Sequence, residues 1–168
     1  MTTYAQVLLI AIPFFVVLML IEGFYGWLKG KKTFRSFDTI SSLSSGVTNI
    51  LKDVLGLTII IVGYEWIYQH IALIQMQESI WIYIVGFILI DFAGYVKHWM
   101  AHHINYFWNE HVVHHSSEEF NLACALRQSI SVIFSIHAFL LIPAALLGVP
   151  PKVIAIIGPL HLFLQFWY

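Results

Sequence analysis

The sequence is poor in charged residues and in cysteine. Asp, Glu, Lys and Arg make up only 10% of its 168 residues, whereas 60% are hydrophobic and the mean hydropathy is +0.81. A soluble domain usually has about a quarter of its residues charged, so this composition predicts a membrane protein. Cys124 is the single cysteine, which excludes a disulfide within the chain and a zinc site built on paired thiolates.

Excess positive charge is also absent. The formal net charge is −1 and the eight Lys and Arg residues lie in short, dispersed groups, so no nucleic-acid partner is expected. The sequence has no H-E-x-x-H motif either, because Glu110 stands directly before His111 instead of inside such a motif. A zinc protease is therefore disfavoured.

Long apolar runs are present instead. The first lacks the basic start and the small-residue cleavage site of a secretory signal, which indicates a retained helix. The predicted membrane spans are Ala5–Leu28, Val54–Tyr68, Ile80–Val96, Ile130–Leu147 and Val153–Tyr168. The polar stretch Ser36–Asn49 is expected at the membrane interface. We expect an all-α fold, a multi-span transmembrane helical bundle with a cytosolic histidine-rich helical cap, and two segments, 1–79 and 80–168.

The basic residues predict the orientation of this bundle. If the first helix leaves its basic flank in the cytoplasm, alternation of the spans puts all the Lys and Arg residues except Lys152 inside. The amino terminus is then outside, and the segment 97–128 lies on the cytoplasmic face. We expect an integral, multi-pass protein of the bacterial inner membrane or the endoplasmic reticulum.

Five of the nine histidines form two clusters, His98-x-x-x-His102 and His111-x-x-His114-His115. Residues three or four apart share one face of a helix, so each cluster can direct its imidazoles toward one point. Five imidazoles at this spacing beside an apolar segment predict a metal site. Imidazole-rich sites suit iron, copper or zinc. Iron would allow oxygen chemistry on an inert lipid, and zinc remains open.

Two polar residues flank the first cluster. Asp91 precedes His98 by seven residues and so lies on nearly the same helix face. Its carboxylate either accepts a hydrogen bond from a ligand imidazole or pairs with a polar group of a neighbouring helix. His103 points about 100° away from His102 around a helix, so it joins the ligands only if the helix breaks there.

Three further residues are candidates for orienting the ligands. Glu118 and Asn121 follow the second cluster and either orient ligands or form a solvated surface. His161 lies in the last predicted span. It either reaches the metal centre or is a buried histidine bonded to a backbone carbonyl.

The clusters lie in longer runs of sequence that resemble a known family: DFAGYVKHWMAH at 91–102, HVVHHSSEEFN at 111–121 and ALRQS at 125–129. These runs closely resemble the fatty acid hydroxylase and sterol desaturase superfamily of membrane di-iron oxygenases. The branch is that of the alkylglycerol monooxygenases and the bacterial sterol-desaturase-like proteins. The resemblance covers roughly residues 90–168.

The resemblance implies an eight-histidine site, with motifs HxxxH, HxxHH and a later HxxHH, that holds two iron ions. It implies hydroxylation or desaturation of a fatty acyl, alkylglycerol or sterol-type lipid with O₂. The electrons would come from cytochrome b5, a ferredoxin-type protein or tetrahydrobiopterin. His98 and His102 match the first motif, and His111, His114 and His115 match the second.

The sequence departs from the family pattern at three points. Trp99 and His161 stand where many relatives have Arg and Asn, and the third HxxHH does not occur before Tyr168. We therefore expect a carboxy-terminally truncated form of an O₂-dependent lipid monooxygenase or desaturase, inactive on its own. Two alternatives stay open. One is a non-catalytic membrane metal-binding or transport protein with Asp91, Glu65 and His161 as a relay, and the other is a b-type haem protein.

Overall fold

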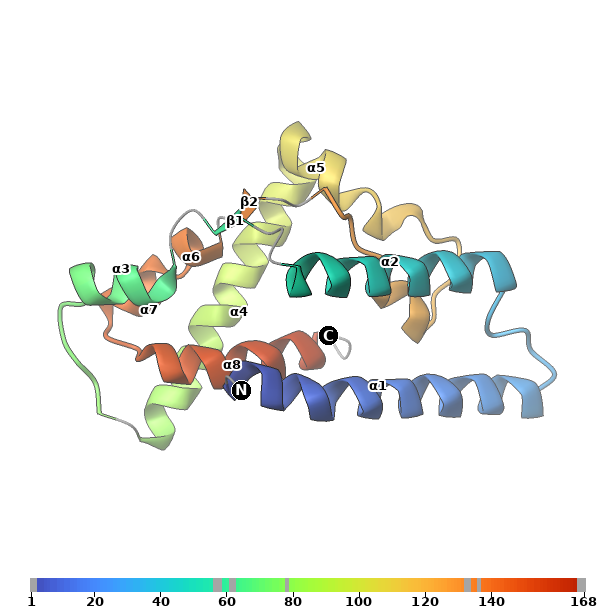
Figure 1. Cartoon of the computed structure of the whole chain (residues 1–168), viewed down its shortest axis with the longest axis horizontal. Coiled ribbons are helices and arrows are strands. Elements are labelled where there is room, and N and C mark those ends of the chain that lie inside the picture. The colour runs from blue at the N-terminus through green and yellow to red at the C-terminus, as the bar shows by residue number, and fades with distance from the viewer. Residues whose placement is uncertain are drawn as a thin grey trace. The chain divides into compact units, whose positions relative to one another are not determined.

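The structure is a computed structural model that describes residues 3–55, 59–60, 63–77, 79–131, 134–135 and 137–165. Most of these residues are helical, which confirms the all-α prediction (Figure 1). The elements are α1 (Thr3–Leu28), α2 (Ser36–Val54), β1 (Ile59–Ile60), α3 (Tyr64–Ile71), α4 (Ile80–His103), α5 (Asn105–His111), η1 (His114–Ser116), η2 (Leu122–Leu126), β2 (Phe134–Ser135), α6 (His137–Leu140), α7 (Ile142–Leu146) and α8 (Pro151–Leu164). The strands β1 and β2 form a two-stranded sheet.

The chain divides into two compact units. Unit 1 comprises Met1–Leu9, Ile60–Met100 and Phe134–Tyr168, and unit 2 comprises Ile10–Ile59 and Ala101–Ile133. The helix α4 continues through the boundary without a break. Each unit draws on both halves of the sequence and does not coincide with the segments 1–79 and 80–168. The assignment of these segments as domains stays a prediction.

Unit 1 has the hydrophobic core, in which α4 packs against the segment from α6 to α8. The buried core residues are Ile82, Ile90, Ala93, Leu141, Ala144, Val149, Val153 and Ile157. Small residues let these helices approach closely, since a side chain at Gly86 would contact Val153. Tyr64 of α3 joins this core and donates a hydrogen bond from its hydroxyl to the carbonyl of Val149 over 2.8 Å.

Packing and polar contacts both join the elements of unit 2. The helix α2 packs against η2, where a Cβ at Gly46 would meet the side chain of Leu126. The helix α1 is tied to the same segment, because the Glu22 carboxylate accepts a 2.9 Å hydrogen bond from the backbone N–H of Leu122. The 113–128 stretch, which carries His114 and His115 of the second histidine cluster, is thus anchored to α1 and α2.

Two helices of the described residues are long and apolar enough to cross a membrane. They are Leu9–Leu28 of α1, with 20 residues, and α4, with 24 residues. A span of the hydrocarbon core needs about 20 apolar residues. The predictions Ala5–Leu28 and Ile80–Val96 thus coincide with long apolar helices, and α4 extends past its predicted end through the first histidine cluster.

The prediction of a span at Val54–Tyr68 is wrong. There α2 ends at Val54, β1 occupies Ile59–Ile60 and α3 begins only at Tyr64, while residues 56–58 and 61–62 lie outside the described part. The sequence offers a reason, because this run contains the β-branched residues 58–62 and the two glycines Gly56 and Gly63. Both features disfavour a continuous helix.

The two later spans also differ from their predictions. Ile130–Leu147 is not one helix but contains β2, α6 and α7, and Pro143 stands in the first turn of α7, where proline is tolerated. Val153–Tyr168 corresponds to α8, which has 14 residues, and residues 166–168 lie outside the described part. The five-span bundle therefore does not hold as continuous helices, although the Gly148–Pro151 turn separates α7 from α8 as expected.

Gly148 is required by this turn, and Gly148→Ala is expected to destabilise unit 1. Its φ is +73°, and a Cβ would collide with the carbonyl oxygen of Ile74. The left-handed conformation alone costs an L-residue about 1–2 kcal/mol. Gly30→Ala is the matched control, because Gly30 has φ +64° but nothing within 4 Å. Thermal unfolding should show a clearly larger loss for Gly148→Ala, and equal losses would contradict the clash.

Candidate metal centre

The first histidine pair lies on the last turns of α4. His98 and His102 are four residues apart on this helix and so lie on one face. The helix ends at His103, because Ile104 is extended, with φ −117° and ψ 117°. His103 is exposed and lies outside the group that the other histidines form.

The second cluster follows directly on α5. His111 is the last residue of this helix, and Val112 and Val113 keep right-handed helical angles up to the 3₁₀ turn η1. This nearly continuous helical path brings His111 and His115, four residues apart, onto one side. Their Nε2 atoms are 3.0 Å from each other. Each atom is therefore aimed at the same small volume.

Four of the five predicted ligands converge around the end of α4. One ring nitrogen from each of His98, His102, His111 and His115 lies within 4.8 Å of the others. The His102 ring centroid is 4.9 Å from that of His111 and 4.9 Å from that of His115. Imidazoles bind transition metals at about 2.0–2.1 Å, so two nitrogens on one ion lie at most about 4.2 Å apart. Small rotations of these side chains would therefore bring the four donors onto one ion.

His114 lies beside this group with its ring turned differently. Its ring centroid is 5.5 Å from that of His111, and its Nδ1 lies 3.2 Å from the carbonyl oxygen of Arg127. A metal-binding histidine commonly donates its second ring N–H to a carbonyl in this way, which fixes the ring and leaves Nε2 for the metal. The position of His114 thus fits a ligand that binds through Nε2.

Trp108 covers the cluster from α5. Its ring centroid is 5.5 Å from His102 and 5.9 Å from His115, and it stacks on His115. From its sequence position Trp108 resembles an interfacial anchor, and its contact with two ligand candidates emerges only from the fold. An aromatic ring packed against the imidazoles limits their rotation, while His102 and His115 stay exposed.

Arg127 is the residue that ties the second cluster to α2. It is 7% exposed, and its guanidinium donates hydrogen bonds to Ser42 Oγ (3.2 Å), Ser116 Oγ (3.2 Å), Asp38 O (2.9 Å) and Asp38 Oδ1 (2.7 Å). Ser116 directly follows His115, and the carbonyl of Arg127 faces His114. One buried residue therefore contacts both ends of η1, Ser116 through its guanidinium and His114 through its backbone carbonyl.

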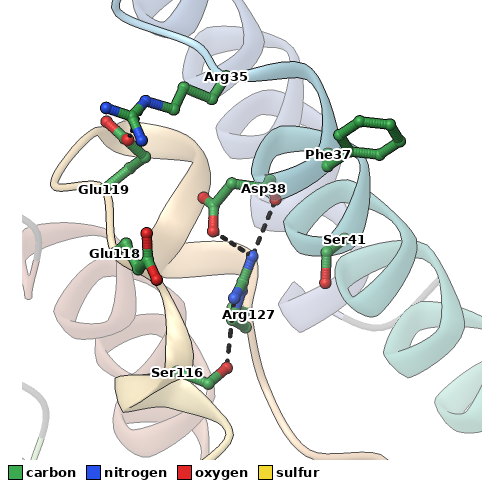
Figure 2. A pocket seen from close by; sticks show the side chains of 8 residues that line it. All are labelled: Arg35, Phe37, Asp38, Ser41, Ser116, Glu118, Glu119 and Arg127. Atoms are coloured by element: carbon green, nitrogen blue, oxygen red, sulfur yellow. Dashed lines mark hydrogen bonds and ion pairs between the residues drawn. The ribbon is translucent and has the colours of Figure 1, made fainter.

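Asp38 and Arg127 form one wall of an open pocket of about 290 Å³ in unit 2 (Figure 2). The second carboxylate oxygen of Asp38 accepts a 2.8 Å hydrogen bond from Ser117 Oγ, so both of its oxygens are engaged. A second ion pair at the pocket joins Arg35 Nε to Glu119 Oε1 at 2.7 Å, but the Arg35 side chain is 65% exposed. The two pairs differ mainly in burial.

Asp91 is paired with His161 of α8. Its Oδ1 lies 3.0 Å from His161 Nε2, and His161 is 5% exposed with an edge contact to Phe87. Of the two roles considered for Asp91, this contact matches the pair with a polar group of a neighbouring helix. Of the proposed relay residues, Asp91 and His161 are thus brought together, while Glu65 accepts a hydrogen bond from Gln69.

The remaining candidates lie in the segment after η1. Glu118 is exposed at the pocket, whereas Asn121 is buried and caps η2, with Oδ1 3.2 Å from the N–H of Cys124. The Asn121 amide also donates to the carbonyl of Thr33 over 3.0 Å. Asn121 thus has a structural role in unit 2. Glu22 was missed at the sequence level, although a carboxylate inside an apolar run is the signal that singled out Asp91.

The donor set determines the chemistry that this group allows. All four converging donors belong to imidazoles. Imidazole binds iron, copper or zinc in its neutral form, so such a ligand set would leave the charge of a bound cation uncompensated. An uncompensated cation is a strong electrophile. The group therefore fits a redox-active or Lewis-acidic metal ion.

Comparison with known proteins assigns this chain to a family. The family model for fatty acid hydroxylase matches residues 83–168. Alkylglycerol monooxygenase from Homo sapiens is 39% identical over 159 residues, 94% of this chain and 35% of that protein. The Danio rerio protein of the same name is 36% identical over the same shares, and the Xenopus tropicalis protein is 33% identical over 158 residues.

The chain spans about a third of the length of these curated relatives. No solved structure matches it. The family model nevertheless covers just over half of the chain and includes every histidine of both clusters. The chain therefore belongs to the fatty acid hydroxylase family.

Proposed function

We propose that this chain contributes a metal centre to an integral-membrane lipid oxygenase that uses O₂. The observation that carries the proposal is the convergence of four imidazole nitrogens within 4.8 Å at the end of α4. The metal ligands would be His98, His102, His111 and His115, with His114 completing the second motif. The relatives named alkylglycerol monooxygenase support the reaction class.

Iron is the metal that this function requires. When bound, it would supply the redox chemistry that activates O₂ for attack on a C–H bond. The four converging nitrogens fit one ion, so the two irons that the family resemblance implies need further ligands, such as His114 and the third histidine motif of relatives. Zinc fits the same imidazoles and would give a centre without redox activity.

The chain's own residues would hold this centre in place. Arg127 fixes the η1 turn through Ser116, its carbonyl orients His114, and Trp108 packs over His102 and His115. Such partners of ligands typically change metal affinity about 10- to 100-fold when they are removed. The geometry of the imidazoles thus depends on contacts with α2.

The substrate we propose is an alkylglycerol or a related lipid. The relatives' name supports this class, and hydroxylation is the reaction that a monooxygenase performs. Hydroxylation of one C–H bond consumes O₂, two electrons and two protons and releases water. The electrons must come from an external donor, and tetrahydrobiopterin, cytochrome b5 and a ferredoxin-type protein are the candidates.

The proposed location is a membrane, with the histidines on the cytoplasmic face. The two long apolar helices support the membrane location. Because Val54–Tyr68 is not a continuous helix, the alternation of spans no longer supports this side of the membrane, and the proposal rests on the basic residues alone. They follow α1 at Lys29, Lys31, Lys32 and Arg35 and recur near the histidines at Lys97 and Arg127. The proposal requires the chain to return across the membrane between α1 and α4.

Metal and product analysis tests the proposal. The complete protein purified in detergent is expected to contain iron and to convert an alkylglycerol to an oxidised product only with O₂ and an electron donor. His98→Ala/His102→Ala should lose both properties while keeping its helical content by circular dichroism. Zinc without product would support the non-catalytic metal protein instead, and a haem absorption band would support the haem protein.

A further inference from the structure

The helix α2 has its apolar face on the outside. Six large apolar side chains recur at spacings of three or four residues, apart from an adjacent last pair, which places them on one face. Their exposed fractions run from 40% to 92%. These residues, called the outer face below, are Phe37, Ile40, Leu43, Val47, Ile50 and Leu51. None of them is charged.

The opposite face of α2 is polar and points into the protein. Asp38 and Ser42 bind the Arg127 guanidinium. Further along the helix, Ser45 Oγ and Asn49 Nδ2 donate hydrogen bonds to the carbonyl of Gln128 over 2.6 and 3.0 Å. The polar side of the helix is therefore occupied by contacts within unit 2.

This arrangement is the reverse of a surface helix in water. There the apolar stripe faces the core and the polar stripe faces the solvent. Leaving six large apolar side chains in water forfeits roughly 1.5–3 kcal/mol for each that burial would otherwise provide. The pattern is stable if the medium around the outer face is itself apolar.

The neighbouring sequence indicates which apolar medium this is. The helix α1 ends at Leu28 after a 20-residue stretch long enough to cross a bilayer, and α2 begins only eight positions later, at Ser36. The connection carries Lys29, Lys31, Lys32 and Arg35. A basic cluster beside an apolar segment complements anionic lipid headgroups.

We propose that the outer face of α2 lies against the acyl chains of membrane lipids. An open groove of about 380 Å³ on this face could accommodate part of an acyl chain. It is lined by Ile40, Leu43, Ser44, Val47 and Thr48. The proposal rests on the membrane location given under the proposed function but not on the metal chemistry. The polar face of the same helix binds Arg127, which in turn binds Ser116 of η1. Helix α2 would therefore lie between the lipid and η1.

Site-directed spin labelling of the complete protein in lipid vesicles tests the proposal. Labels are attached to Ile40→Cys and Val47→Cys in a background in which Cys124 and every other cysteine of the complete protein are replaced by serine. At position 124 the serine hydroxyl can replace the thiol's hydrogen bond to Asn121 O. Collision rates are measured with O₂, which concentrates in the acyl region, and with a water-soluble nickel chelate. We expect O₂-to-nickel ratios several-fold above that of Lys31→Cys.

Leu20→Cys on α1 tests the membrane location separately from the lipid contact of the outer face. Its side chain is 68% exposed and lies within the long apolar stretch, so it reports the membrane location by itself. A high ratio at Leu20 with nickel-accessible labels on α2 would overturn the proposal while the membrane location stands. Low ratios at all three positions would overturn both.

Coverage of the outer face by protein gives a different signal. Labels at Ile40 and Val47 that collide with neither reagent would place protein there, and the proposal would be wrong. Dipolar broadening between singly labelled molecules would identify that protein as a second copy of the chain. Unchanged helical content in all labelled variants verifies that the labels leave the fold intact.

Discussion

Arg127→Met is expected to destabilise unit 2 by about 3–5 kcal/mol, because it leaves a buried carboxylate without its cation. The Arg127 side chain is 8% exposed and that of Asp38 is 16% exposed, and their charged atoms are 2.7 Å apart. Met has a similar length and cannot donate a hydrogen bond. The loss of four hydrogen bonds should release the η1 turn from α2.

The measurement is the free energy of unfolding in detergent, with Arg35→Met as the matched control. Arg35 lines the same pocket (Figure 2) and also makes a 2.7 Å ion pair, but its side chain is 65% exposed. An exposed pair contributes about 0–1 kcal/mol. Equal effects of the two substitutions would show that burial of Arg127 has no energetic consequence.

A double variant keeps the experiment informative if Arg127→Met fails to fold. Asp38→Asn combined with Arg127→Met removes the charge that the single substitution strands, and the Ser117 hydroxyl can still donate to the amide oxygen that replaces the carboxylate. The double variant should be more stable than Arg127→Met alone. Lower stability of the double variant would contradict the stranded-charge explanation.

His111→Ala is expected to abolish metal-dependent activity and to lower metal affinity by more than about 100-fold, since it removes a direct ligand and not merely a partner of one. His111 is central to the cluster, with its Nε2 3.0 Å from that of His115 and its ring centroid 4.9 Å from that of His102. The measurements are the bound metal per chain and the O₂-dependent formation of a lipid product.

His70→Ala is the control for His111→Ala. His70 is exposed on α3, stacks on Trp66 and lies outside the histidine group. Its removal should change neither the metal content nor the activity. If His111→Ala retained full metal content with an intact fold, His111 would not be a ligand, and the metal centre would have to be placed elsewhere.

The spacing of the histidines predicted the two pairs that share a helix face, but not that His114 would lie beside the group that the two pairs form. His98 and His102, and likewise His111 and His115, are four residues apart, and a helical backbone at both places brings each pair together. The role of these residues as iron ligands stays a prediction. The family, in contrast, is confirmed by the match to residues 83–168 and by the relatives.

Apolar composition predicted helices less reliably than periodicity predicted shared faces. It located α1 and α4 correctly but wrongly predicted continuous helical spans at Val54–Tyr68 and Ile130–Leu147. Hydropathy does not measure the preference of a residue for helical backbone angles. Runs of β-branched residues and Pro143 disfavour a continuous helix but are as apolar as the residues around them. The result is a chain with two long apolar helices among its described residues instead of five spans.

By itself, the sequence determined the apolar character of the chain, its family and the pairs of histidines that share a helix face, because each of these depends on composition or on neighbours within one turn. Only the tertiary structure decided that Asp91 pairs with His161 and that Arg127 binds Asp38, which lie 70 and 89 positions apart. It also decided that α2 turns its polar face inward. Such contacts depend on how helices pack against one another, and the period of a helix carries no information about which partner its face will meet.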